Sequence, residues 1–306
     1  MCVRLFDPTD LPPLQRLVNR HLTAVIPGWA LSETALTRHL RRDGSEPITD
    51  PWVRERVTLC AVESEGILAA VHLLRYRDDP EVGSAYRGAG EISWFLAQPD
   101  RGDAASAVLA AGDEYLARWA VSHIYGWGSG LPAGPLWGVP DVWPHILGAL
   151  ETAGYHPSGH REALYGGWLG DRATPTEPPM AGLTVRRRVT AYETRLLAVL
   201  AGEEVGFCDV QPDLTDGGLS PSLAGWGWLT DLQVSEGWRN QGIGRWLVQH
   251  AVRWLQLAGC DRIVLAVADE SEVAGAGRFY RRFGWDVLTR EAHGWRRHAE
   301  QHDGAS

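Results

Sequence analysis

The sequence predicts a mixed α/β fold that is built twice along the chain, and three observations support this prediction. At 306 residues the chain is longer than one typical compact domain. Strand-like and helix-like segments follow one another in a similar order in both halves. A proline-rich, aperiodic stretch separates the halves. Hydrophobic residues at 44% and charged residues at 22% are ordinary globular values, so each half can bury a core.

The first half shows the two periodicities of a mixed α/β unit. Segments with alternating or continuous apolar residues indicate strands, and segments with helical spacing lie between them. The last helix ends before Gly154, which is a typical C-cap residue. The expected strands are residues 3–6, 57–62, 67–76, 91–96 and 124–127, and the expected helices are 11–22, 32–40, 104–121 and 142–153.

An interdomain linker is expected between the halves. The stretch from Asp171 to Pro179 is rich in proline and has no hydrophobic periodicity, as linkers commonly do. We therefore expect a first domain at residues 1–170, a linker at 171–181 and a second domain at 182–306.

The second half repeats the order of strands and helices. The expected strands are residues 183–188, 193–200, 204–210, 226–234, 263–267 and 285–288, and the expected helices are 242–258 and 273–283. The first of these helices carries Ile243, Leu247, Ala251 and Leu255 at helical spacing, which predicts a face that packs on a sheet. A buried helix therefore begins at a glycine-containing turn.

This turn, Arg239-Asn240-Gln241-Gly242-Ile243-Gly244, is a candidate anion-binding site, and we call it the glycine turn. Glycines lack a Cβ, so phosphate oxygens can approach the main-chain N–H groups at the start of the helix. The helix dipole favours negative charge at this end. Arg239 can add a charge-assisted contact.

Two other phosphate-binding motifs do not fit the glycine turn. A P-loop requires Lys followed by Ser or Thr after its last glycine, whereas this chain has Arg245 and Trp246. A dinucleotide-binding fingerprint requires a third glycine, where Leu247 stands. The spacing excludes both.

The glycine turn resembles the first signature of the GNAT acetyltransferase superfamily: Arg or Gln, two variable residues, Gly, one variable residue, then Gly or Ala. The segment Arg278 to Trp285 resembles the second signature, a helix with a tyrosine shortly before Gly and an aromatic residue. Val273 departs from the family, which often has Asn there. The resemblance implies two tandem GNAT-like acyl-CoA N-acyltransferase domains with acetyl-CoA as donor.

The resemblance also implies roles for individual residues. The main chain of strand 229–234 would hold the pantetheine arm and the thioester, and the amides of residues 241–245 would hold the pyrophosphate. Tyr280 would lie close to the sulfur and donate a proton to the departing thiolate. The alternative is a packing tyrosine with a solvated hydroxyl. The implied cofactor-binding residues are Leu232, Val234, Arg239, Asn240, Gln241, Gly242, Ile243, Gly244 and Arg245.

The general base is less well defined. A lysine-like amine has a pKa of ~10.4 and must lose a proton before it attacks. Asp231 is the nearest carboxylate on the strand, although the pleat places it on the opposite face from Leu232 and Val234. Polyamine acetyltransferases, which this strand and turn resemble, have a carboxylate where Thr230 stands. Asp231 and a water relay both stay open.

The first half resembles a degenerate copy of the second half. Aligned in the same order, Arg101 matches the arginine of the glycine turn, but Ala104 and Ser106 replace both glycines. Asp103 brings a negative charge towards the expected pyrophosphate position, and Leu150 replaces the proposed acid. We therefore expect one acetyl-CoA per chain, with a first domain that is structural or completes the acceptor site.

Composition excludes several classes of protein. The net charge of −9 argues against nucleic-acid binding and suits an amine-bearing partner. No apolar run approaches the ~18 residues of a membrane span, and the start lacks signal-peptide features, so we expect a cytoplasmic protein. Four scattered cysteines indicate reduced thiols. We interpret His293, His298 and His302 as part of a solvated tail, and expect no metal site.

The leading hypothesis is acetyl transfer from acetyl-CoA to a primary amine of a small molecule, by direct attack in a ternary complex. The alternative is a non-catalytic CoA-binding sensor or scaffold. Thiol release in the presence of amines distinguishes the two. No motif specifies the acceptor, the acyl length or the oligomeric state.

Overall fold

The structure is a computed structural model, and it describes residues 1–41, 49–64, 66–127, 130–131, 134–170, 177–190, 193–215 and 217–297. Most of the expected linker, together with His298 and His302, lies outside these ranges. The chain divides into two compact units, Met1–Glu162 with Thr289–Ser306, and Ala163–Leu288. This division differs from the boundary expected at residues 171–181.

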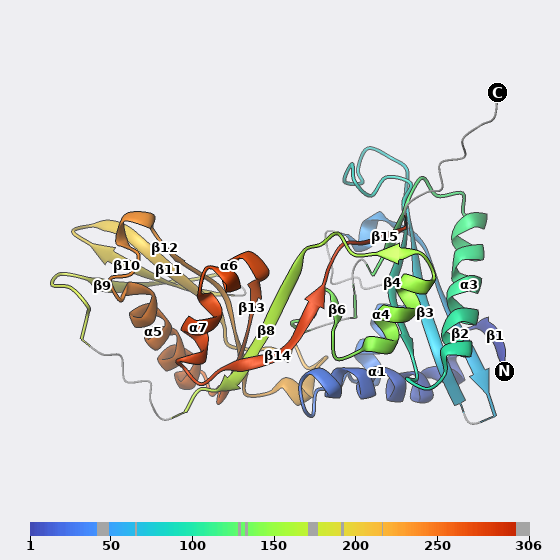
Figure 1. The fold of residues 1–306 in the computed structure, drawn as a ribbon, viewed down its shortest axis with the longest axis horizontal. Helices are drawn as coiled ribbons and strands as arrows, with labels where there is room; N and C mark the ends of the chain where they lie inside the picture. The colour runs from blue at the N-terminus through green and yellow to red at the C-terminus, as the bar shows by residue number, and fades with distance from the viewer. Residues whose placement is uncertain are drawn as a thin grey trace. The chain divides into compact units, whose positions relative to one another are not determined.

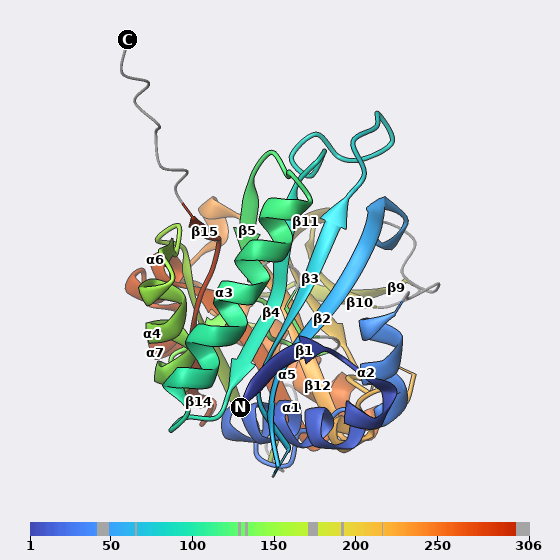
Figure 2. The same ribbon diagram turned by 90° about the vertical axis from the view of Figure 1, so that its right-hand side faces the viewer.

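The first unit is built on a seven-stranded sheet in the order β1-β2-β3-β4-β5-β15-β7. Strands β1 to β4 lie side by side in this sheet (Figure 1). Strands β1 to β4 pair antiparallel, and β4 pairs in parallel with β5. Every residue of β4 is buried, and α3 lies along one face of the sheet (Figure 2). The strands are β1 (Cys2–Leu5), β2 (Val53–Glu63), β3 (Gly66–Tyr76), β4 (Gly90–Ala97), β5 (Ile124–Gly126), β7 (Tyr155–His156) and β15 (Trp295–Arg297). The helices are α1 (Leu11–Val25), α2 (Glu33–Leu40), α3 (Gly102–Arg118) and α4 (Pro144–Thr152), with 3₁₀ turns η1 (Pro8–Asp10) and η2 (Asp50–Trp52).

The second unit contributes most of an eight-stranded sheet in the order β6-β14-β8-β13-β12-β11-β10-β9. Its outermost strand, β6, belongs to the first unit and pairs with the end of β14. Helix α5 packs on β10, β11 and β12. The strands are β6 (Val139–Pro140), β8 (Arg161–Trp168), β9 (Thr184–Val189), β10 (Thr194–Leu200), β11 (Glu203–Gln211), β12 (Trp226–Val234), β13 (Arg262–Ala268) and β14 (Asp286–Ala292). The helices are α5 (Ile243–Leu257), α6 (Asp269–Val273) and α7 (Ala276–Arg281), with 3₁₀ turns η3 (Pro221–Leu223) and η4 (Glu236–Trp238).

The last strand of each sequence half belongs to the sheet of the other half. Strand β8 ends the first half and lies between β14 and β13, whereas β15 ends the second half and lies between β5 and β7. Trp295 pairs with Gly126 of β5, and Arg296 pairs with His156 of β7. This reciprocal strand exchange explains why the compact units do not follow the sequence halves.

The mixed α/β class is confirmed, and most expected elements are present within a few residues of their expected ends. The helix expected at 242–258 is α5, and its apolar stripe is buried. The single helix expected at 273–283 is wrong. Gly275, with φ +113°, separates α6 from α7, because this left-handed conformation cannot continue a right-handed helix.

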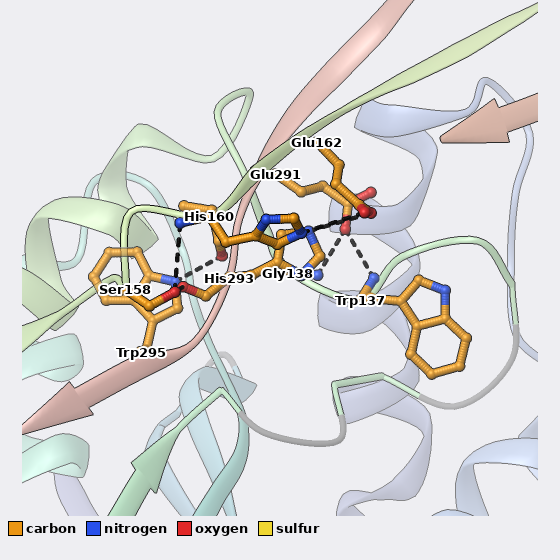
Figure 3. A network of polar contacts seen from close by, with 9 residues as sticks. Trp137, Gly138, Ser158, His160, Glu162, Glu291, His293 and Trp295 are labelled. Atoms are coloured by element: carbon orange, nitrogen blue, oxygen red, sulfur yellow. Dashed lines mark hydrogen bonds and ion pairs between the residues drawn. The ribbon is translucent and has the colours of Figure 1, made fainter. Parts of the chain in front are cut away.

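A buried carboxylate lies at the end of β14 in the first unit (Figure 3). Glu291 is 2% exposed and accepts hydrogen bonds from the N–H groups of Trp137, at 2.8 Å, and Gly138, at 2.6 Å. A Cβ at Gly138 would lie 2.8 Å from the carbonyl oxygen of Ala292, so only glycine allows this approach. Burial raises the pKa of Glu291 to about 7, although the two N–H donors act against this.

Two histidines and a second carboxylate lie beside Glu291. Nε2 of His160 is 3.4 Å from Oε1 of Glu162, and Nε2 of His293 is 3.6 Å from Oε2 of the same residue. Among the described residues, no group of three or more His, Cys, Asp or Glu side chains could hold a metal ion. In the same part of the chain, no helix has the length and apolar character needed to cross a membrane.

Candidate functional site

A cavity of about 910 Å³ lies within the second unit. The end of β12, the glycine turn, α5, α7 and the end of β8 form its walls. Of the residues expected from the sequence, it is lined by Leu232, Val234, Arg239, Asn240, Gly242, Gly244, Arg245 and Tyr280. Asp231, Gln241 and Ile243 are not lining residues. The structure thus brings the glycine turn and Tyr280 to one cavity.

Strand β12 contributes to the cavity where it diverges from β13. Its described parallel ladder with β13 covers only Trp226–Trp228. In the ladder with β11, Asp231 and Leu229 of β12 oppose consecutive residues, so Thr230 is the extra residue of a β-bulge. Beyond the bulge, Leu232 and Val234 face the cavity. The bulge therefore lies where the strand stops pairing with β13.

The glycine turn places an uncapped helix N-terminus at the cavity. Gly242 is the N-cap of α5 and has φ +87°, in the left-handed region that glycine tolerates. A Cβ at this position would lie 3.2 Å from Cβ of Pro179. In the described chain no side chain caps this helix, and its first turn contains no acidic residue. Its first N–H groups and the positive end of the helix dipole can therefore receive an anion.

Side chains of the turn hold its shape. Nε of Arg239 donates to the carbonyl oxygen of Val234 at 3.0 Å, and Nε2 of Gln241 donates to that of Gly237 at 3.1 Å. Ile243 is 1% exposed and belongs to the hydrophobic core. Arg239 thus ties the turn to the end of β12 while it also lines the cavity.

Tyr280 is positioned by aromatic residues of α7 and of the segment that follows it. Its ring stacks on Trp285 with centroids 6.0 Å apart and packs edge-on against Phe279 at 5.0 Å. Tyr280 is 7% exposed, and burial raises its pKa well above the ordinary value, with smaller contributions from Cys208 and Asp231. The phenol is therefore protonated at neutral pH and can donate a proton.

Asp231 lies outside the cavity wall. It is exposed and pairs across the ladder with Asp209, which is buried and held by Arg195 through contacts of 2.8 and 2.5 Å. The strand pleat accounts for its position on the face opposite Leu232. Its role as a base stays a prediction, and its charge is close enough to act on the pKa of Tyr280.

Comparison with protein families matches residues 191–287 to the acetyltransferase (GNAT) domain. This range contains β12, the glycine turn, α5 and Tyr280. Residues 191–287 form a GNAT domain.

The complete chain resembles solved structures that contain GNAT domains. A GCN5-related N-acetyltransferase from Sphaerobacter thermophilus is 20% identical, with a TM-score of 0.61, over 95% of this chain and 93% of that one. A tandem GNAT protein from the clavulanic acid biosynthesis pathway is 14% identical, with a TM-score of 0.59, over 96% and 97%. The comparison with curated proteins gave no match. The chain therefore has a tandem GNAT fold.

The first repeat has no counterpart of the glycine turn. Helix α3 already begins at Gly102, so the aligned Ala104 lies inside the helix and is fully buried. The guanidinium of Arg101 is bound by Asp103, with two contacts of 3.0 Å, and by Glu63 at 3.1 Å. Hydrogen bonds from Arg101 lower the pKa of Asp103 to about 2, so a carboxylate occupies this helix N-terminus.

Several residues that line the cavity were not identified from the sequence. Trp168, Leu169 and Gly170 come from the end of β8, and nothing local indicates that this segment joins the second sheet. Trp238 and Phe283 also line the cavity. Phe283 lies within the second signature, so that motif could have identified it.

Proposed function

We propose that the GNAT domain is an acetyl-CoA-dependent N-acetyltransferase that acts on a primary amine of a small molecule. One observation carries the proposal: the uncapped N-terminus of α5 and the protonated phenol of Tyr280 line the same cavity. The N-terminus of α5 can bind a pyrophosphate, and the phenol of Tyr280 can donate a proton to a leaving thiolate.

The residues of the cavity fit the parts of acetyl-CoA. The N–H groups at the start of α5 would bind the pyrophosphate, where a Cβ at Gly242 would crowd Pro179. Arg245, on the first turn of the helix, adds positive charge. The main chain of β12 at Leu232 and Val234, beyond its ladder with β13, would bind the pantetheine arm.

Acetyl-CoA supplies an acetyl group on a thioester. The amine nitrogen forms the new amide bond with the acetyl carbon while the C–S bond breaks. Tyr280 donates its phenolic proton to the departing sulfur, and the proton lost by the amine returns to the tyrosine through solvent. A protonated amine must lose one further proton before it attacks, and Asp231 is the candidate for accepting that earlier proton through water, because its side chain is exposed. The net charge of −9 favours a cationic acceptor.

The test is thiol release from acetyl-CoA with a panel of small primary amines, including polyamines, amino sugars and amino acids. The full-length chain should release CoA thiol and form the N-acetyl product with at least one amine. The matched control is Gly242→Asp, which places a carboxylate in the anion site and should abolish both binding and release. Acetyl-CoA binding without thiol release from any amine would support a CoA-binding sensor or scaffold instead.

A further inference from the structure

Strand β8 carries a buried tyrosine that contacts α6. Tyr165 is fully buried, and its hydroxyl donates to Oε1 of Glu272 on α6 at 2.6 Å. Arg281 also reaches this carboxylate oxygen, at 3.4 Å, so the contact joins β8, α6 and α7. Tyr165 is not among the residues that line the cavity.

Helix α7 packs closely against this contact at Gly277. A Cβ at Gly277 would lie 2.6 Å from the hydroxyl oxygen of Tyr165 and 2.8 Å from Cγ of Glu272. Gly277 precedes Tyr280 by three residues, so the two lie on neighbouring positions of one helix face. The Tyr165 and Tyr280 rings lie 6.1 Å apart between centroids. The contact between Tyr165 and Glu272 therefore lies directly against the helix that carries Tyr280.

We propose that Tyr165 is a positioning residue for Tyr280, and that the first repeat is retained partly because its last strand supplies this residue. The inference rests on the proposed acid role of Tyr280. The hydrogen bond to Glu272 sets the distance between β8 and the α6–α7 segment, and that distance sets where the Tyr280 phenol faces the cavity. Misplacement of a reacting group by about 1 Å can cost roughly 100-fold in rate.

The experiment compares two variants that remove one hydroxyl each. Tyr165→Phe removes the hydrogen bond to Glu272. Tyr155→Phe is the matched control, because Tyr155 is also fully buried and donates to a carboxylate, Asp113, at 2.8 Å, but lies in the first unit. Each full-length variant is labelled with ¹³Cζ-tyrosine, and the Tyr280 signal is assigned by its loss in Tyr280→Phe. The kcat and the KM for acetyl-CoA are measured with an amine that the panel identifies.

Tyr165→Phe should shift the Tyr280 signal and lower kcat roughly tenfold, with the KM for acetyl-CoA unchanged within about twofold. Tyr155→Phe should change none of these. If Tyr165→Phe does not fold, Glu272→Met, which removes the acceptor of this hydrogen bond at similar side-chain length, should give the same shift of the Tyr280 signal and the same fall in kcat at unchanged KM. An unmoved Tyr280 signal, or equal kcat in the two tyrosine variants, overturns the positioning role. A shifted signal in a protein that acetylates no amine supports the positioning and refutes only the proposed enzyme activity.

Discussion

Replacement of Gly242 by alanine tests the glycine turn directly. An alanine at φ +87° is strained, because its Cβ approaches the following carbonyl, at a cost of about 1–2 kcal/mol. Its Cβ would also lie 3.2 Å from Cβ of Pro179, so one of the two must shift by a few tenths of an ångström. Relief of the strain at φ +87° rotates the first N–H groups of α5 away from their present directions.

The expected loss follows from the hydrogen bonds that the rotation weakens. A hydrogen bond to a charged group contributes about 1.5–3 kcal/mol, and each 1.4 kcal/mol changes Kd tenfold. Loss of one such bond to the pyrophosphate should raise the Kd for acetyl-CoA roughly 10- to 100-fold in isothermal titration calorimetry. The free energy of unfolding should fall by about 1–2 kcal/mol, measured by urea denaturation.

Gly244→Ala is the matched control. A Cβ at Gly244 would lie 3.6 Å from Cγ2 of Val234, which is an ordinary contact, and this residue has a helical backbone. The variant should be as stable as the wild type or up to about 1 kcal/mol more stable, with a Kd changed by less than about threefold. If Gly242→Ala binds acetyl-CoA as tightly as Gly244→Ala, the turn is not the pyrophosphate site.

Three further predictions concern the acid, the stoichiometry and the buried carboxylate. Tyr280→Phe should lower kcat by roughly 10²- to 10⁴-fold in the thiol-release assay and leave the calorimetric Kd nearly unchanged, whereas equal kcat values would leave Tyr280 only a packing role. Calorimetry should give one acetyl-CoA per chain, because Asp103 occupies the helix N-terminus of the first repeat, and a stoichiometry of two would contradict this. The raised pKa of Glu291 means that its carboxyl contributes stability below pH ~4.5 and that this contribution is lost as the pH rises through about 7. Glu291→Gln should therefore gain about 3 kcal/mol relative to wild type between pH 4.5 and 8 in urea unfolding, and parallel pH profiles would refute this.

The elements and residues that could be predicted from the sequence depend on local patterns. The glycine turn was found because its residue types, the preceding strand and the following apolar stripe all lie between residues 229 and 255. Gly275 was a visible signal inside the expected helix at 273–283, since a glycine weakens a helical pattern, and it does break that helix. Where such signals are local, the residue types alone indicate the backbone conformation.

The strand exchange could not be predicted in the same way. Strand β8 has a continuous run of four buried residues and no alternation, and such a run is the same whichever sheet accepts the strand, so the pattern alone does not tell where Tyr165 and Trp168 will lie. The direction of the Arg239 side chain could not be predicted either. Its residue type indicated a contact with an anion, but its Nε donates to the main chain of Val234. The strand exchange depends on contacts between segments that are distant in sequence. The direction of Arg239 depends on the conformation of one flexible side chain.

The return of β15 to the first sheet affects the order in which the protein can be assembled during synthesis. Trp295 pairs with Gly126, so the ladder beside β5 must wait until all the residues between them have been translated. At roughly 5–20 residues per second, this delay lasts on the order of 10–30 s, during which the edge of β5 has no final partner. Unpaired edges invite association with other chains, and such long-range pairings fold slowly. The edge of β5 is therefore open to pairing with other chains until β15 has been made.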